Sequence, residues 1–208
     1  MNKKNSHRSR YWLAGVLVVT AGLAMSATPV GQTAFPSWKI SDAPGELRPL
    51  VSRADLVVVS MQDAVLRELT DALTRGGPEG AIGFCHLDAT FVTQRVGKEE
   101  GIAAGRTSDR LRNPTNAPKP WAAELVKANA GRPVKSVDGF VVDLGDRVGV
   151  LRPMAERPMC AGCHGPAEKL SPGVMRVLKD RYPVDRAVGF REGEIRGWFW
   201  VEMPKHRK

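Results

Sequence analysis

The chain has 208 residues, a length that allows one domain with a substantial core or at most two small domains. Hydrophobic residues make up 42% of it and charged residues 25%, which excludes a largely disordered protein. The net charge is +9, but the basic residues are scattered without an aromatic ladder, so the sequence does not indicate a partner nucleic acid.

Residues 1–27 are typical of a targeting segment. Four basic residues and no acidic ones precede an apolar run of 14 residues that ends at Met25. That run predicts a signal peptide, because a membrane-spanning helix needs about 20 residues. An uncleaved N-terminal membrane anchor is the alternative, since no charged residue lies between Arg10 and Lys39. In both cases the rest of the chain is expected in the periplasm, either soluble or anchored to the outer face of the inner membrane.

Residues 28–50 are rich in Pro, Gly, Ser and Thr, a composition that predicts a linker before a single domain over 51–208. The first helix of this domain is expected over 54–75, where apolar residues recur at helical spacing. Gly76, Gly77 and Pro78 follow and are expected to end it.

A second helix is expected over about 79–95. One stripe of this helix places Cys85 at the centre of the buried face and turns His86 about 100° away from it. The residues of the stripe are Ile82, Cys85, Ala89 and Val92.

The remaining segments alternate between irregular, helical and extended patterns. Residues 101–120 are dense in Pro and Asn, which predicts an irregular or edge-strand segment. A short helix over 121–129 and a hairpin that turns at Gly145-Asp146 are expected next, its strands being 137–144 and 148–154. A Ser-capped helix over 171–181 and a strand over 197–203 complete the domain. The order predicts an α+β fold with a small antiparallel sheet covered by N-terminal helices.

The chemistry of the chain centres on the run Cys160-Ala161-Gly162-Cys163-His164. This spacing predicts covalent attachment of one haem c, with thioether bonds from Cys160 and Cys163 and His164 as an iron ligand. A disulfide-exchange pair would be expected at a helix N-terminus in a βαβ setting, and none is predicted. A zinc site would need four ligands, but the sequence has no second cysteine pair.

The residues alone do not identify the second axial ligand of the haem iron. Met is the usual partner in electron-carrying cytochromes, but Met154 and Met159 lie too close to the attachment motif to cross easily to the far face. Cys85 is the third cysteine of a chain expected in an oxidising compartment, and it is either a ligand or a small buried core residue. The other candidates are His86, Met61, Met175 and Met203, of which the methionines are typical of core positions.

A basic and polar segment follows the second predicted helix. Arg106, Arg110, Arg112 and Asn113 are expected either to pair with the haem propionates or to hold their own loop. Trp121, Trp198 and Trp200 could contact the porphyrin, although core packing is the simpler expectation.

Several short runs in a fixed order, spanning about residues 55–202, resemble a family of single-haem c-type domains with a PAS-like fold. That family also supplies the sensory part of membrane histidine kinases and chemotaxis-type receptors. The resemblance implies that His164 and Cys85 are the two axial ligands. The chain departs from the pattern at Phe190, where Tyr is expected, and at Ala122, where Glu is expected. The runs are 81–85, 106–108, 112–116, Trp121, the haem motif with Gly165, 182–185, 187–190 and 193–197.

Two functions follow from these expectations. The first is redox sensing or electron transfer by a haem with two protein ligands, and the second is a sensor of a small gas ligand with a displaceable sixth ligand. An enzyme such as a haem peroxidase is not expected, because only His86 is a candidate for distal acid–base chemistry. No kinase or receptor output is evident in the sequence, so a separate redox or signalling partner protein is expected.

Overall fold

The computed structural model describes residues 35–87, 89–99 and 101–206, without the side chains of residues 86 and 87. The predicted targeting segment lies outside these residues. Among the helices that the structure describes, none combines the length and the apolar character that a membrane span needs.

The domain is built on one antiparallel sheet of five strands in the order β1-β3-β4-β5-β2. The strands are β1 (Ser37–Lys39), β2 (Ala103–Thr107), β3 (Phe140–Asp143), β4 (Arg147–Ala155) and β5 (Ile195–Pro204). The predicted hairpin is confirmed as β3 and β4, and the predicted edge strand is confirmed as β2. Together with the helices, the sheet confirms the predicted α+β class.

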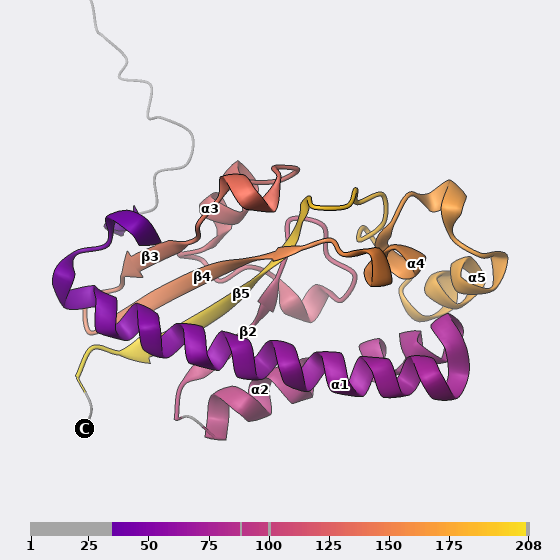
Figure 1. Cartoon of the computed structure of the whole chain (residues 1–208), viewed down its shortest axis with the longest axis horizontal. Coiled ribbons are helices and arrows are strands. Elements are labelled where there is room, and N and C mark those ends of the chain that lie inside the picture. The colour runs from indigo at the N-terminus through magenta and orange to yellow at the C-terminus, as the bar shows by residue number, and fades with distance from the viewer. Residues whose placement is uncertain (1–34, 88, 100, 207–208) are drawn as a thin grey trace, which may run out of the picture.

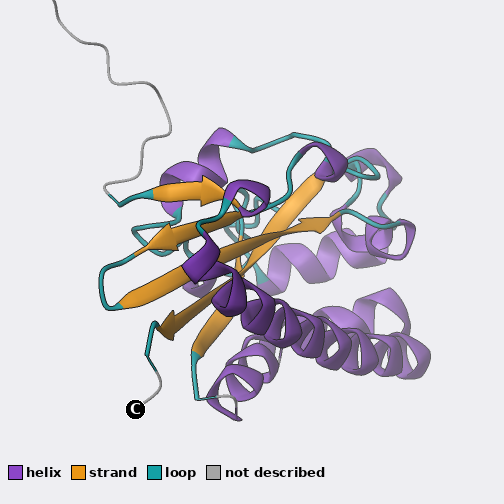
Figure 2. Ribbon diagram, turned by 60° about the vertical axis from the view of Figure 1, so that its left-hand side comes forward, coloured by secondary structure: helices purple, strands orange, loops and turns teal. Residues whose placement is uncertain are grey.

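Helices lie on both faces of the sheet (Figures 1 and 2). They are α1 (Arg48–Leu87), α2 (Ala89–Glu99), α3 (Ala123–Ala128), α4 (Ala161–His164) and α5 (Pro172–Arg181). The first half of α1 crosses one face and α2 packs beside it against β2, while α3 covers the other face. The sheet is therefore covered by the N-terminal helices, as predicted, but only on one side.

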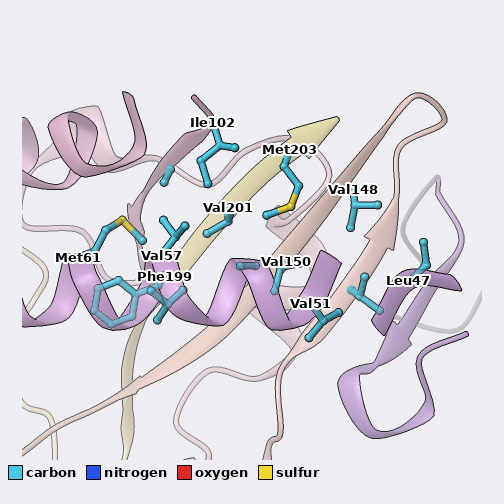
Figure 3. Packing of buried hydrophobic residues seen from close by; sticks show 14 of the residues in the cluster. Leu47, Val51, Val57, Met61, Ile102, Val148, Val150, Phe199, Val201 and Met203 are labelled. Atoms are coloured by element: carbon cyan, nitrogen blue, oxygen red, sulfur yellow. The ribbon is translucent and has the colours of Figure 1, made fainter. Parts of the chain in front are cut away.

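Two hydrophobic cores sit on opposite faces of the sheet because side chains alternate along each strand. Phe199 and Val201 of β5 pack against α1 on one face, and Figure 3 shows them beside Val57 and Met61. Trp198 of β5 packs on the other face, in a cluster with α3. The alternation predicted for the last strand is confirmed, and so is the core packing predicted for Trp121, Trp198 and Trp200.

The predicted break at 76–78 is present as a kink inside α1. Gly77 has φ 60° and ψ −168°, a left-handed φ that glycine adopts without steric cost. The chain resumes helical geometry at Pro78, so α1 reaches beyond the sheet and packs its second half on α5 (Figure 1). The predicted helix over 79–95 is thus divided between the end of α1 and α2.

The linker predicted over 28–50 was wrong for residues 37–50. Trp38 lies in β1 and pairs with Val141 of β3, and α1 begins at Arg48. Ala43 and Leu47, in the turns between them, are buried in the core under α1. In a strand of three residues, the alternation of buried and exposed side chains is too short to be recognised from the sequence. This segment is a strand because it pairs with β3, about 100 residues later in the chain.

Candidate functional site

One cavity brings together most of the predicted site residues. Its lining includes Cys85 from α1, Arg106 from β2, Arg112 and Asn113 from the following loop, and His164 from the end of α4. These residues lie far apart in the sequence, and the sheet, α1 and the loop between α5 and β5 position them around one space. Cys160 and Cys163 are partly exposed free thiols in the same short segment as His164.

The haem motif folds as a short 3-10 turn, Pro158–Cys160, that runs directly into α4. The amide of Gly165 donates a hydrogen bond to the Ala161 carbonyl oxygen at 3.0 Å and ends the single helical turn. A Cβ at Gly165 would lie 2.6 Å from that same oxygen, so only glycine fits the turn after His164. The glycine that follows the motif is therefore explained by a close backbone approach.

His164 is held in an orientation suited to a metal ligand. Its Nδ1 lies 2.8 Å from the carbonyl oxygen of Ala187, a contact that assigns the proton to Nδ1 and leaves the Nε2 lone pair available. The ring of Phe190 meets it edge-on, with centroids 6.4 Å apart. Removal from water lowers the pKa of His164 well below its usual value, and the charges of Arg196 and Arg112 lower it further. The imidazole is therefore neutral, as a metal ligand must be.

Arg112 ties the haem motif to the loop that orients His164. Its Nε donates to Asp185 Oδ2 at 3.0 Å, and its Nη2 donates to the carbonyl oxygens of Cys163 at 2.6 Å and Ala187 at 3.2 Å. Its guanidinium is thus engaged by protein acceptors. Of the two roles predicted for Arg112, the geometry matches the one in which it holds the loops.

Asn113 likewise holds its own turn. Its Oδ1 accepts hydrogen bonds from the backbone N–H of Thr115 at 3.0 Å and from the Thr115 hydroxyl at 2.8 Å. Arg110 is engaged too, because it donates to Glu194 Oε1 at 3.0 Å and stacks over the ring of Phe190.

Replacing Arg112 with Ala should destabilise the domain strongly. The change leaves Asp185 nearly buried without its partner and removes two hydrogen bonds to backbone carbonyls. Loss of one member of a buried ion pair costs about 3–5 kcal/mol. Denaturant unfolding should measure this loss, with Arg181→Ala as control, since its pair with Asp180 is exposed and should matter by less than about 0.5 kcal/mol. Equal effects of the two changes would contradict the role given to Arg112.

Two arginines face the cavity with unsatisfied nitrogen atoms. In the part of the chain that the structure describes, the buried Nε atoms of Arg106 and Arg196 have no hydrogen-bond partner. Arg196 Nε lies 3.1 Å from Glu156 Oε2, close enough for an ion pair but without the alignment of a hydrogen bond. Burial lowers the pKa of Arg106, although the nearby Cys85 raises it. Buried cations in this state favour an anionic ligand.

Cys85 lies within the electrostatic influence of these arginines. Burial raises the pKa of its thiol, whereas the charges of Arg106, Arg112 and Arg196 act in the opposite direction. The side chain of His86, the rival ligand, lies outside the described residues.

The methionines fall into three groups. Met61 and Met203 are core residues, as predicted. Met159 and Met175 are exposed, so the core position predicted for Met175 is wrong. Met154 lines the cavity, and its sulfur accepts a hydrogen bond from Arg196 Nη2 at 3.0 Å. The position of Met154 in the sequence, close to the attachment motif, did not predict that it lines the cavity.

Sequence reasoning missed Glu156, which directly follows β4. Its side chain is only 2% exposed, and burial raises its pKa to about 7. Its sequence neighbourhood reads as the polar end of a strand, and only the pairing of β4 with β5 brings Arg196 beside it.

Comparisons with known proteins agree with this architecture. A family model described as Tll0287-like matches residues 42–204. The crystal structure of the cyanobacterial heme-protein Tll0287 is similar in fold, with a TM-score of 0.50, 22% sequence identity, and coverage of 80% of this chain and 99% of that chain. No curated protein matches the chain.

Proposed function

The chain belongs to the Tll0287-like family, and from that premise we propose that it is an exported domain with one covalently bound haem c that acts in redox sensing or electron transfer. The structurally similar cyanobacterial protein is a heme-protein. The observation that carries the proposal is that His164 and Cys85, which lie 79 residues apart in the sequence, line a single cavity.

The residues around this cavity fit a haem. They provide a neutral imidazole nitrogen and a thiol as ligand atoms, and two further thiols in the attachment spacing. The unpartnered Nε atoms of Arg106 and Arg196 match the two carboxylates that a haem carries. When bound, the haem supplies one-electron chemistry.

Each residue has a distinct role in this proposal. Cys160 and Cys163 form the thioether bonds, and His164 binds the iron through Nε2. Cys85 is the second ligand, as a thiolate whose negative charge Arg106 offsets. Arg112 holds the haem motif and the Ala187 carbonyl in place by hydrogen bonds, and that carbonyl in turn orients the imidazole of His164. We assign no enzymatic activity, and we propose a PAS-like arrangement for the sheet and its helices.

Spectroscopy of the purified protein tests this function. We expect a low-spin ferric haem spectrum and a reversible one-electron redox titration with one haem per chain. Protein expressed with the haem-attachment machinery but lacking haem would contradict the proposal.

Sensing of a small gas ligand is the second candidate. It is supported by the burial of the Cys85 thiol, which raises its pKa and favours the protonated, weakly binding form. Adding carbon monoxide to the reduced protein separates the two candidates. A carrier with two firm ligands should keep its spectrum, whereas a sensor should give the spectrum of a carbon monoxide complex.

The proposed location has its own test. Thioether attachment of haem follows export, and the N-terminal sequence is basic and then apolar. Cell fractionation should therefore place the haem-containing protein in the periplasm or on the outer face of the inner membrane. Removing residues 1–27 should abolish haem attachment without changing the folded domain's sequence. Mature haem protein in the cytosolic fraction would contradict this location.

A further inference from the structure

We propose that Glu156 is a proton-binding site coupled to the haem, gaining a proton when the haem gains an electron and releasing it on reoxidation. This inference rests on the proposed function and extends it to a pH-dependent redox reaction. Nothing in the chain's sequence around Glu156 indicates such a role, which follows from where the fold places its carboxylate.

The position of Glu156 connects it to the cavity through one residue. Its carboxylate is buried and lies beside Arg196 Nε, while Arg196 lines the same cavity as Cys85 and His164. Neither carboxylate oxygen has a hydrogen-bond partner among the described residues. A buried carboxylate without hydrogen bonds is costly when charged, and protonation relieves that cost.

The surrounding charges act on the carboxylate of Glu156 in opposite directions. Arg196 on β5, and Arg110 and Arg112 on the loop after β2, favour the charged form, whereas Glu194 opposes it. Arg110 is already paired with Glu194, and Arg112 is already paired with Asp185.

Burial outweighs the remaining attraction and raises the pKa of Glu156 to about 7. An ordinary glutamate is fully ionised at neutral pH and cannot take up a proton there, whereas Glu156 is partly protonated. A small change in local charge is therefore enough to shift its protonation.

The coupling follows from charge balance. An electron delivered to the cavity by a one-electron donor adds a negative charge near Glu156, which raises the proton affinity of its carboxylate at low dielectric. Glu156 then takes one proton from solvent and forms an O–H bond. The buried site keeps its net charge, and both the electron and the proton leave on reoxidation.

Redox titrations of the haem protein at a series of pH values test the coupling. Between the pKa of Glu156 in the oxidised protein and its higher pKa in the reduced protein, the reduction potential should fall with pH. The limiting slope is a tenfold change in the equilibrium constant for reduction per pH unit, or about 59 mV for one electron. Glu156→Gln should remove this slope. Its potential should match that of the wild type at acid pH and exceed it at alkaline pH, since the variant never carries the negative charge that stabilises the oxidised form.

Glu194→Gln is the matched control from the same charge network. Glu194 is ion-paired with Arg110, so its loss should shift the potential without removing the pH slope. In case Glu156→Gln does not fold, infrared difference spectra of the wild type give an independent measurement. Reduction should produce the C=O band of a protonated carboxylic acid, and that band should shift in heavy water.

The outcomes separate the two proposals. A haem protein whose potential does not change with pH, or whose slope survives in Glu156→Gln, would overturn the coupling and leave the proposed function intact. A wild-type protein without haem would overturn both.

Discussion

Replacing both Cys160 and Cys163 with Ser is expected to abolish haem that survives denaturation and acid-acetone extraction. Thioether bonds resist both treatments, whereas a haem held only by axial ligands is released when the protein unfolds. Serine is close to cysteine in size but cannot form the thioether. Because both thiols are partly exposed, and only Cys163 packs against a hydrophobic cluster, from its edge, the double substitution should remove the attachment and leave the fold.

Haem staining after denaturing electrophoresis and the mass of the intact chain measure this effect. Each single serine variant should keep one thioether and therefore retain some covalent haem. Cys85→Ser is the matched control, because it makes the same substitution at a cysteine that lies outside the attachment motif. Haem that extracts from the wild type, or stays attached in the double variant, would show that attachment does not run through these two residues.

Replacing Cys85 with Ala should change the iron's electronic state and raise the reduction potential. A thiolate stabilises ferric over ferrous iron, so the wild-type potential should lie well below that of a His/Met cytochrome. Removing it should raise the potential by on the order of 0.1 V or more, since axial ligands set haem potentials over about 0.8 V. The low-spin thiolate signal in the ferric EPR spectrum should disappear at the same time.

The neighbouring variant His86→Ala is the control for this assignment. If Cys85 is the ligand, His86→Ala should keep both the thiolate signal and the low potential. A thiolate signal that is missing from the wild type, or that survives in Cys85→Ala, would exclude Cys85. Met154→Leu adds a second control, because Met154 is the other sulfur that lines the cavity.

The sequence predicted those elements whose signals are local. Ser171 caps α5 by accepting the Val174 amide, with Pro172 at its first position, and the hairpin turns at Gly145. The stripe containing Cys85 predicted helical structure and an inward face, since a helical repeat is readable from a dozen residues, but the structure divides the stripe between α1 and α2.

The parts that could not be predicted depend on distant partners. β1 is a strand only because β3 pairs with it, and α1 continues through Gly77 because its second half finds α5 to pack against. In the cavity, Arg106 and Arg112 look alike in sequence. The fold gives Arg112 three hydrogen-bond acceptors from the protein, whereas the Nε of Arg106 has no partner among the described residues. Glu156 is similar, because nothing near it in the chain predicts burial beside Arg196.

The place of β5 in the sheet sets the order in which the domain can be completed. β5 is the last strand in the chain, yet it lies between β4 and β2 and pairs with both. Synthesis delivers a chain from its N-terminus, so the cysteine pair emerges more than thirty residues before the strand that closes the sheet. Until then β2 has no neighbour in the sheet, and the cavity lacks the wall that carries Arg196. Pairings over such sequence separations form slowly. The thiols of Cys160 and Cys163 are therefore open to modification before residues 195–204 complete the cavity, and they stay partly exposed in the finished domain.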